Sequence, residues 1–495
     1  MRLFGGQRFR AAATLSGGAC ILFASAAMAA SIGLPDAVHH QQKAAVDELL
    51  KQHADINATD VEGMTALMWA AHWNDLGLVR ALLAAGANPN VKSAFDDSAL
   101  YEACLNGNAA MVEALLKAGA EANASRGEGE TALMTASRTG NVETVKLLLA
   151  HGADPKAQES WRHETALMWA AAENHADAVR ALIAAAADVN AKSIVWDWPK
   201  LKLRSGDLGV ALPDGGLSTL MYAARQGTVE PARLLVEAGA DLNYKEPQGY
   251  NALLIAILNG QYELASMLID KGTKIDDGAL RLTVEVRDMD KSDKHPAPTD
   301  YGKLRSLDFM KILIDHGAAL DGEFKPRLPQ RAIMEGGGPA IGSPLYRAAR
   351  STDLEAMRLL LERGANPKYT TQNHSTVLMA AAGQNFNKET GTGGEQKDAI
   401  EAIKMLIARG LDVNAANDLG QTAMHFAAQK GSEKVIEFLA ESGAKIDAKD
   451  KRGKTPLDIA SGIGLGGNSE GVPEEEALSV LKKLQAAKGR GAQPE

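Results

Sequence analysis

Apolar residues along most of the chain recur in short paired segments that have the periodicity of an α-helix. Residues 66–71 form one compact apolar segment, and Val142, Val145 and Leu148 show the three-residue spacing of another. Residues three or four apart lie on one face of a helix, so each pair of segments predicts two short helices. A break such as Thr139-Gly140 separates the two helices of a pair.

The pairs repeat with a period of about 33 residues, a length typical of repeat proteins. The clearest copies begin at four threonines, Thr65, Thr131, Thr165 and Thr422. Well after the threonine, at the end of the second helix, comes a Gly-Ala pair followed by Asp, Asn or Glu. A fixed period of this kind predicts a stack of similar units rather than one globular core.

Both ends of each unit carry residues that suit helix termini. A Thr, Ser or Asn that can accept a backbone N–H as N-cap precedes the first helix, at Thr65, Ser98, Thr131, Thr165, Ser218, Asn251, Ser343, Thr376, Thr422 and Thr455. Glycine at the end of the second helix is expected to supply the left-handed C-terminal residue. The second helices are expected to end at His53, Gly86, Gly119, Gly152, Ala186, Gly239, Gly272, Gly317, Gly364, Gly410 and Gly443.

The segment Thr65-Ala66-Leu67-Met68-Trp69-Ala70-Ala71 and the later Leu-Leu-x-x-Gly-Ala-Asp pattern resemble the two signatures of the ankyrin repeat. The match recurs from about residue 41 to residue 487. The resemblance implies an all-α ankyrin-repeat solenoid of stacked helix-turn-helix units with short β-turn connections. Most copies have Met where the family has His. Only His425 keeps the His, so the side-chain hydrogen bonds of that position are expected to be absent elsewhere.

The spacing of the second-helix ends reveals four insertions. Two lie between repeats, at 194–216 and 322–341, and two lie between the helices of one repeat, at 289–306 and 385–397. The predicted organisation is a run of N-terminal repeats at 34–279, an irregular repeat with insertions at 280–341, C-terminal repeats and a capping unit at 342–488, and a disordered tail at 489–495.

Residues 1–29 have the pattern of a secretory signal peptide, with cleavage expected after Ala29. The apolar segment at 19–28 is shorter than the roughly 20 residues that span a bilayer, so stable membrane insertion after cleavage is not expected. The protein is therefore expected in the periplasm or outside the cell. Cys104 is then the single remaining cysteine, and it occupies a position that is Ala in other copies, which indicates a small core residue.

Composition and motifs argue against several kinds of chemistry. The formal charge is −9, and it becomes −12 without residues 1–29, which contain three arginines and no acidic residue; nucleic acid is therefore not the expected partner. Gly462, Gly464 and Gly467 match the spacing of a dinucleotide fingerprint but follow a predicted helix instead of a strand. No catalytic residue, metal site or cofactor is expected. The resemblance also implies a binding protein rather than an enzyme.

Aromatic residues mark the candidate binding surface, because all six tryptophans fall between residues 69 and 198. The position after Met in the first helix, on the inner, concave side of such a stack, carries Trp69, Trp169 and Tyr222. Aromatic anchors dominate protein interfaces, so the predicted partner-binding residues are Trp69, Trp73, Trp161, Trp169, Trp196, Trp198 and Tyr222. The alternative role for Trp69 and Trp169 is to fill space beside the small alanines.

The predicted function is that of an exported scaffold that binds a protein partner through its concave face and its turn-side loops. Two other interpretations stay open from the sequence. The first is a small-ligand-binding protein or enzyme with a pocket lined by the 194–216 insertion. The second is an accessory subunit of an exported enzyme.

Overall fold

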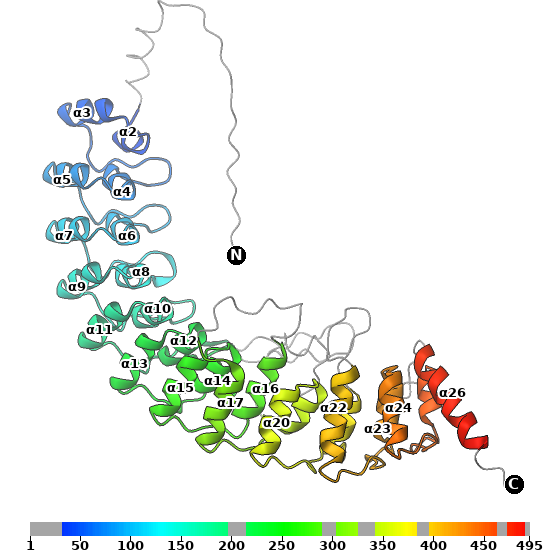
Figure 1. Ribbon diagram of the computed structural model, residues 1–495. Coiled ribbons are helices and arrows are strands. Elements are labelled where there is room, and N and C mark those ends of the chain that lie inside the picture. Colours follow the sequence, from blue (N-terminus) through cyan, green and yellow to red (C-terminus); the bar gives the residue numbers. More distant parts are fainter. Residues whose placement is uncertain are drawn as a thin grey trace, which may run out of the picture. The chain divides into compact units, whose positions relative to one another are not determined.

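The computed structural model describes residues 32–196, 214–289, 303–324, 342–383, 396–462 and 473–490. The chain divides into two compact units, unit 1 up to Ser160 and unit 2 from Trp161 onward. In both units, short helices alternate between two rows (Figure 1). We call the first helix of each repeat the inner helix and the second the outer helix. This architecture confirms the predicted all-α ankyrin solenoid.

Unit 1 contains four inner and four outer helices among its described residues. The inner helices are α2 (Leu34–His39), α4 (Ala66–His72), α6 (Ala99–Leu105) and α8 (Ala132–Thr139). The outer helices are α3 (Lys43–Lys51), α5 (Leu76–Ala84), α7 (Ala109–Lys117) and α9 (Val142–Ala150). A single 3-10 turn, η1 (Gly127–Gly129), lies before α8.

Unit 2 continues the same alternation. Its inner helices are α10 (Ala166–Ala172), α12 (Thr219–Gln226), α14 (Ala252–Leu258), α16 (Ala279–Met289), α19 (Pro344–Arg350), α21 (Val377–Ala382), α23 (Ala423–Gln429) and α25 (Pro456–Ala460). Its outer helices are α11 (Ala176–Ala184), α13 (Val229–Glu237), α15 (Tyr262–Asp270), α17 (Ser306–Asp315), α20 (Leu354–Glu362), α22 (Gln396–Ile407), α24 (Glu433–Glu441) and α26 (Glu475–Arg490).

The core of each unit runs along the stack between the two rows. Within a unit, each inner helix packs on the inner helix of the next repeat and on the outer helix of its own repeat. Ala70 and Ala71 have no exposed surface, and Leu67 beside them is 1% exposed. Because alanine side chains are small, neighbouring inner helices approach closely, and each repeat is stabilised mainly by its neighbours.

The predicted N-cap contacts are present at nine of the ten positions, eight as a direct side-chain bond and one, at Thr422, in a capping box. The side-chain oxygen accepts a backbone N–H at Thr65, Ser98, Thr131, Thr165, Asn251, Ser343, Thr376 and Thr455. The prediction is wrong for Ser218, whose side chain makes no capping bond. Thr422 is the N-cap of α23 and forms a capping box with His425, whose Nδ1 lies 3.0 Å from the Thr422 hydroxyl.

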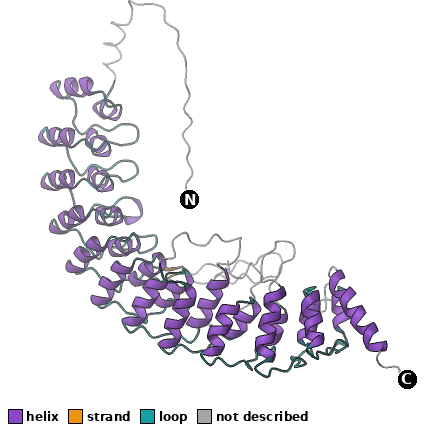
Figure 2. Ribbon diagram, viewed as in Figure 1, coloured by secondary structure: helices purple, strands orange, loops and turns teal. Residues whose placement is uncertain are grey.

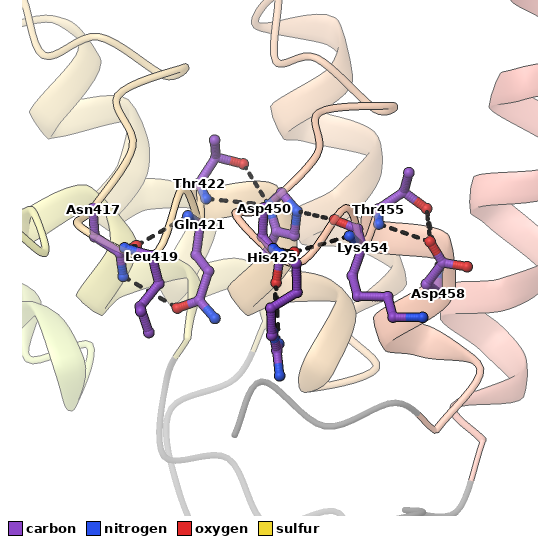
Figure 3. Close-up of polar contacts among 10 residues, drawn as sticks. Asn417, Leu419, Gln421, Thr422, His425, Asp450, Lys454, Thr455 and Asp458 are labelled. Carbon is purple, nitrogen blue, oxygen red and sulfur yellow. Dashed lines mark hydrogen bonds and ion pairs between the residues drawn. The ribbon is translucent and has the colours of Figure 1, made fainter. Parts of the chain in front are cut away.

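His425 is buried and joins two repeats (Figure 3). Its Nδ1 accepts the Thr422 N–H at 3.1 Å, so the ring proton is on Nε2, which donates to the Lys454 carbonyl at 3.2 Å. Burial lowers the pKa of His425, although the hydrogen bond to the Lys454 carbonyl acts in the opposite direction, and the ring is therefore kept neutral. The expected loss of this capping contact elsewhere is partly wrong, because Met68 Sδ accepts the Thr65 N–H at 3.4 Å.

The nine glycines predicted to end the outer helices have the expected left-handed backbone. His53 and Ala186, at the ends of two other outer helices, take the same conformation with φ of 54° and 62°, which the sequence did not predict for a non-glycine residue. In unit 1, an added Cβ at Gly86, Gly119 or Gly152 would meet no atom within 4 Å. A non-glycine residue there is therefore tolerated sterically, and its cost is the backbone strain of positive φ.

The insertions begin or end in described structure. The 194–216 insertion opens and closes with two strands, β1 (Val195–Trp196) and β2 (Asp214–Gly215), which pair antiparallel next to the helical stack (Figure 2). The structure does not describe residues 197–213, 290–302, 325–341 and 384–395. The predicted signal segment, most of the Gly462 to Gly467 motif and the last five residues also lie outside the described residues. Gly462 follows helix α25 rather than a strand. In the described part, we find no helix that is long and apolar enough to cross a membrane.

We expect the Ala186→Gly variant to be more stable than the wild type by about 1 kcal/mol, because glycine adopts the left-handed conformation without strain. Ala185, one residue earlier, has a negative φ of -86°. The matched Ala185→Gly variant should therefore lose up to about 1 kcal/mol. Urea unfolding followed by circular dichroism measures both changes. Equal effects of the two variants would contradict the role of the left-handed position.

Candidate protein-binding surface

The predicted aromatic residues differ widely in accessibility. Trp73 is 43% exposed and Trp161 is 53% exposed, whereas Trp69 and Tyr222 are buried and Trp169 is half-buried. Trp196 contributes its backbone to β1, but its side chain and the whole of Trp198 lie outside the described residues. Trp69 and Trp73 belong to unit 1, and Trp161, Trp169 and Tyr222 belong to unit 2.

In unit 1, Trp69 is the centre of an aromatic cluster. Its indole stacks on the His39 ring, with centroids 3.7 Å apart and planes within 5°. Its N–H donates to the Asp60 carboxylate at 2.7 Å, from the turn before α4. Trp73, one helical turn further on, is stacked at 6.4 Å and leaves part of its ring accessible. Trp69 is thus fixed from three sides, and Trp73 is the indole that a partner can reach.

In unit 2, one carboxylate brings Trp169 and Tyr222 together. Glu164 accepts the Trp169 indole N–H and the Tyr222 hydroxyl, both at 2.7 Å. Burial raises the pKa of Tyr222, and the negative charge of Glu164 raises it further. Met168 and Ala191 pack against the same tyrosine ring. The two aromatic residues are therefore held by a polar contact that joins successive inner helices through the turn before α10.

Asp60 and Glu164 were not among the predicted site residues. A signal for Glu164 was present, since an acidic residue directly precedes the N-cap threonine in two copies, at Glu130 and Glu164. In both copies this carboxylate accepts a hydrogen bond from the side chain five residues later, Thr135 in one and Trp169 in the other. Asp60 lies nine residues before Trp69, and no comparable spacing identifies it.

One contact recurs between successive inner helices. A residue near the end of one inner helix touches the first-turn residue thirty positions later, as His39 does with Trp69 and His72 with Glu102. His72 Nδ1 lies 3.0 Å from the Glu102 carboxylate. In unit 2 the same place between α16 and α19 is taken by Glu285 and Arg347, which an insertion separates further in sequence. The chemistry of this contact therefore differs along the chain.

The contact at Glu285 is a buried ion network. Arg347 donates from Nε and Nη2 at 2.6 and 3.0 Å, and Arg281 donates from Nη1 at 2.6 Å. Burial by itself raises the pKa of Glu285, but the charges and hydrogen bonds of Arg347 and Arg281 outweigh it and lower the pKa to about 2. The Arg281 side chain is 3% exposed, and those of Glu285 and Arg347 are each 8% exposed. The three charged side chains therefore bind one another and are buried within the inner row.

Among the described residues, we find few groups that could support catalysis or hold a metal ion. No group of three His, Cys, Asp or Glu side chains in the described ranges could hold a metal ion. Cys104 is buried, and burial raises the pKa of its thiol, which leaves it unreactive. A depression of about 240 Å³ is lined by Pro367, Lys368 and Leu411, among others, in the C-terminal repeats. Trp169 and Tyr222 do not line it.

Comparison with known families identifies the class of protein. The family model described as ankyrin repeats (3 copies) matches residues 34–126, 100–193, 201–278 and 395–471. These segments together cover more than half of the chain. The chain therefore belongs to the ankyrin repeat family, a class of protein-protein interaction modules.

Relatives share the repeat but not the length of this chain. Human ankyrin repeat and SOCS box protein 6 is 25% identical over 241 residues, which are 47% of this chain and 52% of that protein. The ankyrin repeat and KH domain-containing protein mask of Drosophila melanogaster is 36% identical over 105 residues, 21% of this chain and 2% of that protein. The chain thus spans about half or less of these relatives.

A solved structure, that of the human ASB11 ankyrin repeat domain, aligns with 49% of this chain and 99% of its own. The sequence identity is 24% and the TM-score is 0.39. The family assignment rests on the family model above.

We expect Glu285→Gln to destabilise unit 2 by about 3 kcal/mol at pH 7, because it removes the buried negative charge to which Arg281 and Arg347 both donate hydrogen bonds. The folded-state pKa of Glu285, about 2, lies below its ordinary value of 4.5, so its contribution is complete above pH 4.5 and is lost as the pH falls toward 2. The difference between variant and wild type should shrink over that window in urea unfolding at graded pH.

The control is Glu355→Gln. Glu355 pairs with Arg287 but is 64% exposed, so its loss should cost less than about 1 kcal/mol. A Glu285→Gln penalty as small as that of the control would show that the buried network does not stabilise the fold.

Proposed function

We propose that this protein is an exported, non-enzymatic scaffold that binds another protein through exposed aromatic residues on its inner helices and turns. The observation that carries the proposal is the exposure of Trp73 and Trp161 in an otherwise regular ankyrin stack. Large aromatic side chains are costly to leave in water, and they supply much of the binding energy at protein interfaces.

The turn around Trp161 favours binding by the turn-side loops. The Arg162 guanidinium lies over the Trp161 ring, 4.8 Å from its centroid. The Arg162 carbonyl accepts the Ile194 N–H at 2.7 Å, which brings this turn beside the start of the 194–216 insertion. Val195, the first residue of β1, is itself 45% exposed. Trp161 and Val195 thus place two accessible apolar side chains near one edge of unit 2.

Export is supported by the segment 1–29 at the start of the chain. Three arginines precede a short apolar segment, and Ala27-Met28-Ala29 fits a small-x-small cleavage site. The mature protein contains one cysteine, Cys104, which is buried, so the fold requires no disulfide in an oxidising compartment.

The two other interpretations have weaker support. An accessory subunit of an exported enzyme would use the same exposed tryptophans, so it is a special case of the scaffold proposal. A ligand-binding protein or enzyme would need a cavity at Trp169 and Tyr222. In the part of the chain that the structure describes, these rings pack against Met168 and Ala191 and share the carboxylate of Glu164.

We expect the mature protein to begin at Ala30. Expression of the full-length chain in the source organism, followed by fractionation and mass spectrometry of the intact protein, measures this directly. The control is Ala29→Gln, which removes the small residue at the cleavage site and should leave the precursor uncleaved. An uncleaved wild-type protein recovered from the cytoplasm would contradict export.

We expect Trp73→Ser combined with Trp161→Ser to lose the bound partner in affinity capture from the periplasmic fraction. Loss of an interface tryptophan typically costs about 2 kcal/mol or more, so two such losses weaken binding by roughly three orders of magnitude or more. Both side chains are accessible, so the variant should keep its circular dichroism spectrum and thermal midpoint.

The matched control for capture is Leu419→Ser. Leu419 is an apolar turn residue of the C-terminal repeats that is 52% exposed, similar to Trp161. It should retain the partner. Equal recovery of every partner by the double tryptophan variant and by the wild type would refute binding through these residues.

A further inference from the structure

Charge is unevenly distributed between the two sides of unit 1. The turns and inner helices of three repeats (residues 55–72, 88–105 and 121–138) contain nine Asp or Glu and three Lys or Arg. The outer helices of the same repeats (α5, α7 and α9) contain two Asp or Glu and three Lys or Arg. The negative charge of unit 1 is thus concentrated on the side of the turns and inner helices.

Three carboxylates on this side are exposed at the turns. Glu62, Asp96 and Glu128 lie in successive turns before α4, α6 and α8. In Figure 1 these turns project from the inner helices on the side opposite the outer helices. The Ala94 N–H donates to the Glu62 carbonyl at 3.0 Å, so the first two turns are neighbours. Lys92 Nζ donates to the Ser125 carbonyl at 2.8 Å, so the second and third turns are neighbours too. The turns that carry the three carboxylates thus form a row along the stack.

Apolar side chains accompany this row. Val61 is fully exposed beside Glu62, and Phe95 is 65% exposed beside Asp96. Trp73 adds an accessible indole face at the end of α4. A partner that matches these features must present positive charge and apolar groups together, and lysine or arginine can also pack on an indole face.

We infer that the turn and inner-helix side of unit 1 binds a basic polypeptide segment of the partner, one that combines Lys or Arg with apolar side chains. This inference rests on the proposed function and specifies the chemistry of the partner. Glu62, Asp96 and Glu128 attract the cationic groups, and Val61, Phe95 and Trp73 contact the apolar ones. The surface excludes acidic partners, because like charges across an interface are repulsive.

The test uses the mature full-length protein and two fluorescein-labelled peptides. One contains Lys, Phe, Gly and Ser, and the other has Glu in place of each Lys. Fluorescence anisotropy should show binding of the lysine peptide only, and binding should weaken when the salt concentration rises from about 0.05 M to about 0.5 M. Equal affinity for both peptides, or no affinity for the lysine peptide, would overturn the inference.

Charge reversal locates the site. The triple variant Glu62→Lys, Asp96→Lys and Glu128→Lys should bind the lysine peptide at least about tenfold more weakly. The control triple variant, Glu362→Lys, Glu437→Lys and Glu441→Lys, changes the net charge equally but alters exposed residues of α20 and α24. It should stay within about twofold of the wild type, and an equal loss in both variants would show a non-specific charge effect.

Trp73→Ser and Phe95→Ser test the apolar part of the surface. Each should weaken binding of the lysine peptide at high salt, where screening reduces the charge contribution. The results separate the two proposals. A captured partner that is lost with the tryptophan variant but kept by the charge-reversed variant leaves the scaffold proposal standing and overturns this inference.

Discussion

The close contact of alanine pairs between successive inner helices is the constraint on which the rest of this structure depends. Ala70 and Ala71 are fully buried against neighbouring helices, and Ala170 and Ala171 repeat the arrangement in unit 2. A helix as short as α4 cannot be stable alone, so each repeat depends on its neighbours for its buried surface. The same requirement fixes the period, keeps the helices in two rows and aligns the turns on one side.

Once the stack is fixed, equivalent places in different repeats come to carry different chemistry. The contact between successive inner helices is an aromatic stack at His39 and Trp69, and a partly exposed polar pair at His72 and Glu102. At Glu285 and Arg347 it is a buried ion pair. The buried pair joins α16 to α19 and so holds the two repeats together. The aromatic and acidic residues of unit 1 leave accessible groups, which is why binding of a basic segment is proposed there.

Repetition explains why the fold could be predicted so fully, and it also explains what was missed. Every glycine predicted to be left-handed after an outer helix has positive φ, and Ala186 at the equivalent place has positive φ too, because the place in the repeat determines the backbone. The N-cap prediction was wrong for Ser218, which follows the 194–216 insertion and makes no side-chain capping bond. Glu164 pairs with Trp169 and also with Tyr222, which lies 58 positions further along the chain, after an insertion. The period of the repeat does not reveal the contact with Tyr222.

The sequence by itself determined the helix pairs, their period, the places where the period is interrupted and the family. These features depend on local spacing and on residue types that repeat. Only the tertiary structure decided which aromatic residues a partner could reach. Trp69 and Trp73 lie four residues apart along the chain, yet Trp69 is 8% exposed and Trp73 is 43% exposed. The physical reason is that accessibility depends on side chains from neighbouring repeats and turns, here His39 and the Asp60 turn, which cover one indole and leave the other open.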